Sequence, residues 1–413
     1  MTRNNTPALR FDGFSGEWKT NQVGRIAARA IGGGTPSRAV PDYWNGSIPW
    51  IQSSDVKERS IFGCTPKHFI SSRGLASSAT SLVKGGSIAI VTRVGVGKVA
   101  VMAEDYCSSQ DFLNLSDVQG DLTFLGVLLK HELEGISSQT QGTSIKGVAK
   151  ENVMSLNIHV PTSEEQRAIG ELFADLDALI DQHRAKHANL QQTKTALMQR
   201  MFPQDGADEP ELRLGGASNP WVLRHLGEFE ITTGPFGSTL HAEDYVEHGT
   251  PIVTTEHFKS GLLPLTGQGV PQVSDDDRRR LKAYWLRTDD IVFSRVGSVD
   301  INARVTELQN GWLFSGRVLR VRPDATCESE FLHSVLETNP VRGSIRKRAV
   351  GMSMPSINTA ILANTSFYQP PTLEEQRAIG EVFSNLDDLI AAEASYIAQL
   401  TQAKTALLQR MFV

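Results

Sequence analysis

Cysteine is scarce in this sequence, and so are the features of exported or membrane proteins. The three cysteines, Cys64, Cys107 and Cys327, lie far apart and form no CxxC pair. This spacing predicts neither a disulfide framework nor a zinc site, and it fits a reducing compartment. No apolar run approaches the roughly 20 residues that cross a bilayer. The opening MTRNNTPALRF is polar where an export signal would be hydrophobic. We therefore expect a cytoplasmic protein with no membrane partner.

Motifs that carry chemistry are also missing. GVGKV at Gly95 lacks the spacing and the Ser/Thr of a phosphate-binding loop. His183 and His187 are four residues apart, but a polar layer between helices explains them better than zinc does. We find no methyltransferase motif of the Asn-Pro-Pro-Tyr type, no helicase box and no nuclease cluster. The sequence thus predicts no catalytic residue, no metal and no cofactor in this chain.

The net charge of −5 counts at first sight against a nucleic-acid partner. Most of the acidic excess lies in two stretches. Residues 163–213 contain 6 basic and 10 acidic side chains, and residues 373–413 contain 3 and 6. Residues 1–162 and 214–372 have net charges of +3 and −1. The two large segments can therefore hold local basic patches.

One phrase occurs twice: PTSEEQRAIGELF begins at Pro161 and PTLEEQRAIGEVF begins at Pro371. Aligning 161–202 with 371–412 gives 26 identities in 42 positions, and a fainter repeat ends at Trp18 and Trp221. The chain therefore reads as two units, about 8–202 and 211–412, joined by the acidic linker PQDGADEPE. The expected domains are a body at 1–160, a helix at 161–203, a linker with a second body at 204–370, and a helix at 371–413.

Each copy of the phrase predicts the start of a helix of about 40 residues. Thr162 with Glu165, and Thr372 with Glu375, match capping boxes. Apolar side chains then alternate in steps of four and three, which is typical of a coiled-coil seam. The predicted seam consists of Ile169, Gly170, Phe173, Leu176, Ile180, Leu190, Leu197, Ile379, Gly380, Phe383, Leu386, Ile390, Leu400 and Leu407.

A lone amphipathic helix of this length would expose its seam, so we expect the two helices to pair. A pseudo-twofold relation between the units predicts an antiparallel pair with one body toward each end, and a parallel pair is the weaker alternative. Glycine inside a helix costs about 1 kcal/mol relative to alanine. Gly170 and Gly380 are therefore either tolerated or required by the close approach of another backbone.

The two bodies read as mixed α/β with many short strands. β-branched runs separated by glycine occur in both, as in SIPWIQSSDV, GGSIAIVTRVGVGKVAVM and ENVMSLNIHV of the first body and TPIVTTEHF, TDDIVFSRVGSVDINARV and WLFSGRVLRVRP of the second. Shared anchors are sparse: Trp18 and Trp221, Gly24 and Gly227, the RVG triplets at Arg93 and Arg295, and Gly142-Thr-Ser against Gly351-Met-Ser. A common framework with divergent surfaces is what two readers of different targets would show.

This layout of a divergent body, a G-[TM]-S loop, P-T-x-E-E-Q-R-A-I-G and a heptad helix resembles the specificity subunit of type I restriction-modification systems. The resemblance covers essentially the whole chain. It implies a mixed α/β fold of two target-recognition domains, separated by two long antiparallel coiled-coil helices in a pseudo-twofold internal repeat. It also implies a cytoplasmic protein of a bacterium or archaeon.

The same resemblance implies a function in DNA recognition without catalysis. The domains would read the two halves of a bipartite, asymmetric site in double-stranded DNA. Two methyltransferase subunits would use S-adenosylmethionine to methylate adenine N6, and restriction subunits that translocate DNA would use ATP and Mg²⁺. This chain would itself bind none of these cofactors.

Candidate DNA contacts come from polar and basic side chains in glycine-rich or strand-end segments. Arg93 and Arg295 follow predicted strands, and arginine to guanine is the commonest base-specific contact; each side chain alternatively caps a turn or pairs with an acid. The basic run RGSIRKR and the amide-rich SSQTQGTSIKG read as loops that suit groove or phosphate contact, or merely solvated loops. The full set is Thr35, Ser37, Arg38, Ser53, Arg93, Gln139, Gln141, Thr143, Ser144 and Lys146 in the first body, and Ser238, Thr239, Thr254, Arg295, Arg342, Arg346, Lys347, Arg348 and Ser353 in the second.

Two other readings stay open. A duplicated coiled-coil scaffold whose bodies bind proteins would show no salt-dependent affinity for DNA. A self-contained nuclease or methyltransferase fragment would show activity as an isolated chain, and the missing motifs argue against it.

Overall fold

The computed structural model describes residues 5–139, 147–204, 206–214, 219–235, 239–351 and 353–413. The chain divides into two compact units. Unit 1 contains Met1–Ala185 and Ala394–Val413, and unit 2 contains Lys186–Glu393. Each unit thus consists of one body together with part of each long helix, α5 (Ser163–Met201) and α10 (Leu373–Met411).

The two predicted long helices are confirmed. Thr162 Oγ1 accepts a hydrogen bond from Glu165 N at 3.4 Å, and Thr372 Oγ1 accepts one from Glu375 N at 3.3 Å. The other half of each predicted capping box is wrong, because both oxygens of Glu165 accept from Arg10 at 2.6 Å. An arginine fork satisfies two carboxylate oxygens at once and so captures a side chain that would otherwise bond to the helix start.

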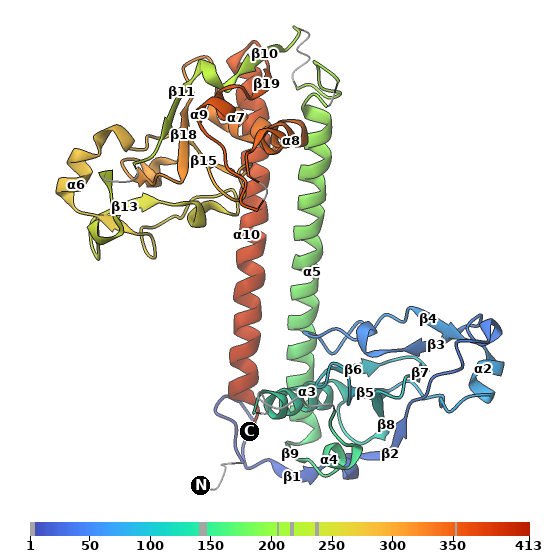
Figure 1. The fold of residues 1–413 in the computed structure, drawn as a ribbon. Coiled ribbons are helices and arrows are strands. Elements are labelled where there is room, and N and C mark those ends of the chain that lie inside the picture. The colour runs from blue at the N-terminus through green and yellow to red at the C-terminus, as the bar shows by residue number, and fades with distance from the viewer. Residues whose placement is uncertain (1–4, 140–146, 205, 215–218, 236–238, 352) are drawn as a thin grey trace. The chain divides into compact units, whose positions relative to one another are not determined.

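In unit 1 the first part of α5 lies beside the last part of α10 (Figure 1). Phe173 packs on Phe412 with ring centroids 5.7 Å apart, and His183 contacts Tyr396 at 4.5 Å. Between these contacts the Lys404 ammonium forms an ion pair with the Asp177 carboxylate on α5. Residue numbers rise along one helix as they fall along the other, so the two segments are antiparallel.

In unit 2 the remaining parts of the same helices pair in the same sense. Phe202 packs on Phe383 with ring centroids 5.3 Å apart, and Lys194 Nζ lies 2.6 Å from Asp387 Oδ1. Lys186 forms an ion pair with Glu393 about two turns further along. The predicted antiparallel pairing is therefore confirmed within each unit.

The predicted seam residues serve mainly as parts of the two cores. Ile169 and Phe173 are buried in the core of unit 1, and Ile379 and Phe383 are buried in the core of unit 2. The next residues along the seam pack partly buried against the same cores; these are Leu176 and Leu407 in unit 1, and Leu197 and Leu386 in unit 2. Ile180 is buried, while Leu190, Ile390 and Leu400 are half-buried.

Both helical glycines permit a close approach by a helix of the adjoining body. A Cβ added at Gly170 would lie 2.5 Å from Asp121 Oδ1, at the start of α3 (Leu122–Gln139). One added at Gly380 would lie 2.9 Å from Phe331 N, at the start of α7 (Ser329–Leu336). Of the two expectations for these glycines, the structure shows the close approach, made by α3 and α7.

Unit 1 contains three sheets, with strand orders β1-β9, β2-β8-β5-β6 and β4-β3-β7. All pairs are antiparallel except β3 with β7. Its strands are β1 (Lys19–Gln22), β2 (Ala27–Gly32), β3 (Ile48–Ile51), β4 (His68–Ile70), β5 (Ser87–Val91), β6 (Val99–Met102), β7 (Cys107–Ser108), β8 (Phe112–Val118) and β9 (Asn157–Val160), and its remaining α-helices are α1 (Val23–Ile26), α2 (Ser72–Ala76) and α4 (Lys150–Met154).

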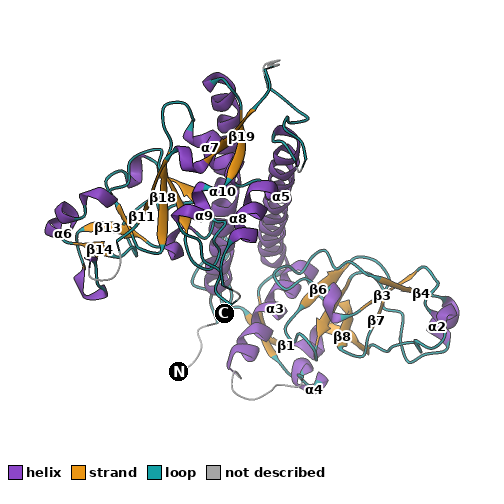
Figure 2. Ribbon diagram, turned by 45° about the horizontal axis from the view of Figure 1, so that its top comes forward, coloured by secondary structure: helices purple, strands orange, loops and turns teal. Residues whose placement is uncertain are grey.

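Unit 2 repeats this plan with one added strand, in sheets β10-β19, β11-β18-β15-β16 and β12-β14-β13-β17. Figure 2 shows its strands in orange and its helices in purple. The strands are β10 (Val222–His225), β11 (Glu230–Thr233), β12 (Tyr245–Val246), β13 (Thr250–Val253), β14 (Gln272–Val273), β15 (Ile291–Ser294), β16 (Asn302–Arg304), β17 (Leu313–Phe314), β18 (Val318–Arg322) and β19 (Ser366–Gln369), and the remaining α-helices are α6 (Asp275–Arg280), α8 (Asn339–Arg348) and α9 (Thr359–Ala363).

Two segments differ from the elements expected from the sequence. ENVM in ENVMSLNIHV belongs to α4, which spans Lys150–Met154, so only the second half of that run is a strand. RGSIRKR is helical, because α8 has Pro340 in its first turn and buries Val341 and Ile345 one turn apart. Proline suits the first helical turn, and this apolar spacing places both side chains on one face. No helix in the described residues is long and apolar enough to span a membrane.

Candidate nucleic-acid interface

The repeated phrase anchors each long helix to its own body. In unit 1, Gln166 Nε2 donates to Pro161 O at 3.0 Å, and Gln166 Oε1 accepts from Asp121 N at 3.1 Å. In unit 2, Gln376 makes the matching bonds to Pro370 O at 3.0 Å and Glu328 N at 2.9 Å. Each glutamine thus ties the start of a long helix to the start of α3 or α7, so the shared motif builds the framework.

The candidate interface lies on the parts of the two bodies that make no contact with the repeated motif. In unit 2, Arg295 follows β15 and is held through three hydrogen bonds. Its N donates to Arg317 O at 2.9 Å, its O accepts from Ile357 N at 2.9 Å, and its guanidinium donates to Gly316 O at 3.1 Å. The side chain is half-buried and turned toward the neighbouring strand.

The counterpart of Arg295 in unit 1 is Thr92 rather than Arg93. Thr92 N donates to Asp111 O at 2.7 Å, Thr92 O accepts from Val148 N at 2.7 Å, and its hydroxyl donates to Asp111 O at 3.0 Å. The two RVG triplets are therefore offset by one residue. Because alternate residues of an extended strand face opposite sides, Arg93 is exposed while Arg295 packs inward.

Ser53 and Thr254 are also offset by one residue, although both lie after matching strands, β3 and β13. Thr254 precedes the 3-10 helix Thr255–Phe258, whereas Ser53 is the first residue of the 3-10 helix Ser53–Asp55. Thr254 N donates to His257 Nδ1 at 3.1 Å, and the counterpart bond in unit 1 runs from Gln52 N to Asp55 Oδ2 at 3.0 Å. Burial lowers the pKa of His257, which favours the neutral ring that this bond requires.

Thr254 and Arg295, two of the predicted contacts, line one hollow of about 520 Å³ in unit 2. Its lining residues are Pro235, Leu240, Tyr245, Thr254, Thr255, Glu256, Arg295, Ser315, Gly316 and Arg317. Ser315 Oγ is buried and has no hydrogen-bond partner in the described residues. The sequence analysis did not single out Ser315 or Arg317, because they lie at the junction of two strands with no motif of their own.

The first glycine-rich loop of unit 1 places three predicted residues on the surface. Thr35, Ser37 and Arg38 are exposed. Thr35 Oγ1 donates to Gln110 Oε1 at 2.7 Å, and the Arg38 guanidinium lies 5.7 Å from the ring centroid of Trp44. In unit 2, Thr239 is half-buried and its carbonyl accepts from Arg280 at 2.7 Å, while Ser238 lies outside the described residues.

The basic run of unit 2 lies on helix α8, and three of its four cations have partners within the protein. Arg342 and Arg346 both approach the buried Asp300 Oδ2, at 2.7 Å and 3.3 Å. Arg348 donates to the backbone carbonyl of Asn364. Lys347 and the nearby Ser353 are exposed. Arg342 and Arg346 therefore tie α8 to the turn that precedes β16.

The corresponding predictions in unit 1 fall mostly beyond what the structure describes. Gln139 is the last residue of α3, and nothing further is described of its side chain. Gln141, Thr143, Ser144 and Lys146 lie outside the described residues. These five, like the other predicted contacts, stay predictions.

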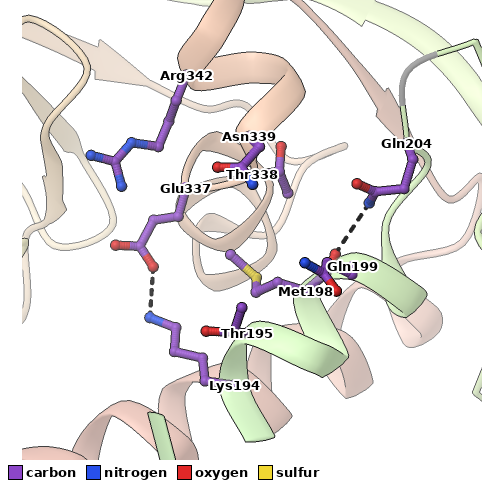
Figure 3. A pocket seen from close by; sticks show the side chains of 9 residues that line it. All are labelled: Lys194, Thr195, Met198, Gln199, Gln204, Glu337, Thr338, Asn339 and Arg342. Carbon is purple, nitrogen blue, oxygen red and sulfur yellow. Dashed lines mark hydrogen bonds and ion pairs between the residues drawn. The ribbon is translucent and has the colours of Figure 1, made fainter. Parts of the chain in front are cut away.

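A half-buried charge cluster in unit 2 was not predicted from the sequence. Lys194 Nζ lies 2.7 Å from Glu337 Oε2, as Figure 3 shows, and 2.6 Å from Asp387 Oδ1. His333 completes a group with Glu337 and Asp387 whose ligand atoms lie within 4.8 Å of one another, a spacing that suits a metal ion. The Lys194 ammonium bonds to both carboxylates, so the chain supplies its own cation there.

Burial and charge act in opposite directions on the pKa values of this cluster. Burial raises the pKa of Asp387 even though Lys194 opposes the shift. For Glu337, burial would raise the pKa, but the neighbouring His333 and Lys194 lower it overall. In unit 1 the counterpart Lys404 meets one carboxylate, Asp177. No sequence signal pairs these groups, because the partners lie far apart along the chain.

Comparison with known proteins connects these units to DNA recognition. A family profile described as the type I restriction modification DNA specificity domain matches residues 15–192 and 219–402. The chain is 22% identical over 405 residues to the type I restriction enzyme MjaVIII specificity subunit of Methanocaldococcus jannaschii, covering 95% of this chain and 91% of that one. It is 30% identical over 173 residues to the EcoR124I/EcoR124II specificity subunit of Escherichia coli, covering 40% and 41%.

The fold agrees with this family. The crystal structure of the type I restriction-modification S subunit from M. genitalium superposes with a TM-score of 0.69 at 16% identity, covering 99% of each chain. The resemblance inferred from the sequence and the mixed α/β fold with two long helices are thereby confirmed. Because the family profile covers most of both bodies and most of both helices, this chain belongs to the family of type I restriction-modification DNA specificity subunits.

Proposed function

We propose that this chain recognises a bipartite, asymmetric sequence in double-stranded DNA, with one half read by each unit. It directs two methyltransferase subunits, and restriction subunits where they are present, to that sequence. The chain itself carries out no catalysis. S-adenosylmethionine, ATP and Mg²⁺ belong to the partner subunits.

One observation carries this proposal: the two units share a framework but differ at matching positions on the bodies. The hydrogen-bond patterns pair Thr92 of unit 1 with Arg295 of unit 2, and Asp111 with Arg317. Each pair exchanges a neutral or acidic side chain for an arginine within an equivalent backbone. Two readers with the same scaffold and different surface chemistry select different sequences, which makes the combined site asymmetric.

The charge distribution is compatible with this proposal. Protein–DNA affinity depends heavily on cations that neutralise phosphates, and partner subunits add their own. The acidic excess of this chain lies in residues 163–213 and 373–413, which contain the long helices. The bodies are close to neutral overall and carry exposed cations such as Arg38, Arg93 and Lys347.

An exchange of bodies within the chain tests the proposal. Residues 23–156 and 226–365 have equivalent ends, since Val23 N donates to Leu156 O at 3.1 Å and Leu226 N donates to Thr365 O at 3.0 Å. Replacing 23–156 by a second copy of 226–365 keeps both long helices and both two-stranded sheets. Co-expressed with its methyltransferase, this variant should methylate a site in which both halves carry the sequence that unit 2 reads.

The reciprocal exchange is the matched control. A chain with two copies of residues 23–156 should methylate a site built from two copies of the other half. Single-molecule sequencing of methylated adenines reads both results directly. If either variant changes both halves to new sequences, or leaves both as they were, the units do not read separate halves and the proposal is wrong.

A further inference from the structure

The hollow in unit 2 is built around the rigid turn Ser315–Arg317. Ser315 N donates to Val253 O at 2.9 Å, and Ser315 O accepts from Val318 N at 2.9 Å. Arg295 holds the other side of the turn, with its N bonded to Arg317 O and its guanidinium bonded to Gly316 O. Bonds from two neighbouring segments thus fix the position of these three residues before any ligand binds.

Hydroxyl side chains also line this hollow. Thr254 and Thr255 belong to its lining, and the Thr254 hydroxyl lies 3.2 Å from His257 Nδ1. Ser315 belongs to the lining too, but its Oγ is covered by protein atoms and has no hydrogen-bond partner in the described residues. The Ser315 hydroxyl is therefore closed to a ligand, whereas the Arg317 side chain is exposed.

The charge of the hollow is positive. Arg295 and Arg317 line it, and Arg317 is exposed. The one carboxylate in the lining belongs to Glu256, which forms an ion pair with Lys259. The hydrogen bond from Lys259 lowers the pKa of Glu256, and Arg317 adds to the shift. Arg295 and Arg317 therefore face one carboxylate, Glu256, which is already paired with Lys259. This arrangement favours an anionic ligand.

We propose that this hollow binds a phosphate group of the DNA backbone, with Arg317 as its main cationic contact. Arginine, serine, threonine and backbone N–H groups are the usual phosphate contacts in protein–DNA complexes, and such contacts set register without reading bases. The hollow is larger than one phosphate, which leaves room for the flanking sugar. The DNA source of the phosphate rests on the function proposed above.

Unit 1 has a different set of side chains at the matching positions. Asp111 takes the place of Arg317, Gln110 that of Gly316, and Thr92 that of Arg295. An acid at the position of the main cation repels phosphate. We therefore infer that the phosphate contact belongs to unit 2, and that unit 1 meets the duplex through other residues.

Two probes of the full-length chain test this inference. The first is a set of short DNA duplexes that differ in sequence, measured by fluorescence anisotropy over a range of salt concentrations. Arg317→Gln should weaken binding to every duplex by the same factor and reduce the slope of log K against log salt by about 0.9, the value for one phosphate. Arg279→Gln, an equal charge change on α6 outside the hollow, should leave both quantities unchanged.

The second probe is inorganic phosphate, followed by isothermal titration calorimetry. The wild-type and Arg279→Gln chains should bind it, while Arg317→Gln should lose binding. Equal phosphate binding by wild type and Arg317→Gln would overturn the inference. So would an unchanged salt slope, or a loss confined to duplexes that differ at one base pair, which would identify Arg317 as a base-reading residue.

The two probes also separate this inference from the function on which it rests. If the wild-type chain binds inorganic phosphate through Arg317 but binds no duplex, alone or with its methyltransferase, then the hollow is an anion site and the DNA function is wrong. If duplexes bind with full sequence preference and Arg317→Gln changes nothing, the DNA function stands and the phosphate site is wrong.

Discussion

The two units agree closely where each body contacts the long helices, and they differ in the rest of each body, here called the outer body. Arg10 with Glu165 in unit 1 repeats as Arg213 with Glu375 in unit 2, each as a double hydrogen bond. The aromatic cluster Trp18, Phe124, Phe173 and Phe412 repeats as Trp221, Phe331, Phe383 and Phe202. The residues that the repeats share are therefore largely those that anchor the long helices, and the residues that differ mark the surfaces on which the units have diverged.

The half-buried lysines of the long helices should show the largest difference between the units. Lys194→Met leaves two carboxylates, Glu337 and Asp387, without their shared cation, whereas Lys404→Met leaves Asp177, which keeps a hydrogen bond from Ser60 at 3.1 Å. Removing one member of a fully buried ion pair costs about 3–5 kcal/mol, and these pairs should cost less because their side chains are 7–25% exposed. We expect a larger loss of stability for Lys194→Met than for Lys404→Met.

Hydrogen exchange measured separately for each unit checks this expectation, because it reports the free energy of local opening. Lys84→Met is the control: its pair with Asp105 is solvent-exposed, and such pairs contribute little to stability. A loss for Lys194→Met as small as that of Lys84→Met would show that the charge cluster does not hold α5 in place.

The helical glycines should show a smaller effect, alike in the two units. Helix propensity alone predicts that Gly→Ala stabilises by about 1 kcal/mol. At Gly170 and Gly380 the new methyl would clash with α3 or α7, and overpacking of this kind costs about 1–3 kcal/mol. We therefore expect both variants to lower the melting temperature, Gly380→Ala more, because its contact at 2.9 Å is to a backbone nitrogen.

Gly343→Ala on α8 sharpens this test. A Cβ at Gly343 meets nothing within 4 Å, so propensity should act alone and the variant should melt slightly higher than wild type. If Gly170→Ala and Gly380→Ala also melt higher, the close packing of α5 on α3 and of α10 on α7 is not tight enough to require glycine.

The smallest expected effect concerns pH and unit 2. Burial lowers the pKa of His333 below its ordinary value of 6.5. Between its folded pKa and about 6.5, the unfolded chain therefore binds a proton that the folded chain does not, and stability falls as pH falls through this range. His333→Gln should remove part of the loss of stability of unit 2 between pH 7 and pH 5.5.

Denaturant unfolding at several pH values, followed by hydrogen exchange in α7, measures this difference. Unit 1 serves as the internal comparison, because the match of Phe124 with Phe331 at the starts of α3 and α7 places Gly126 where unit 2 has His333. An identical pH profile for wild type and His333→Gln would show that the proton affinity of this ring is the same in the folded and unfolded states.

Local patterns in the sequence predicted the framework well. The 39-residue helices follow from a cap at Thr162 or Thr372 and an apolar period with a short polar interruption, both of which are local in sequence. Most β-branched runs formed the strands expected of them. The partners of Lys194 could not be predicted, because Glu337 and Asp387 lie 143 and 193 residues away and only the fold brings them together.

The outer bodies were harder to predict for three physical reasons. The identical RVG triplets suggested that Arg93 matches Arg295, but the hydrogen bonds of the strands set the true match one residue earlier, at Thr92. The basic run of unit 2 looked like a loop because of its glycine, yet the burial of Val341 and Ile345 makes it a helix. The hollow around Arg317 has no motif, since its lining comes from segments that lie far apart along the chain.

The most direct test of the central claim is a map of methylated adenines in the host genome, made by single-molecule sequencing with and without this chain. Two unlike readers on matching frameworks predict the loss of methylation at one sequence that has two different specified halves and an unread stretch between them. Loss at a palindromic or uninterrupted sequence, or no loss at all, would contradict the account.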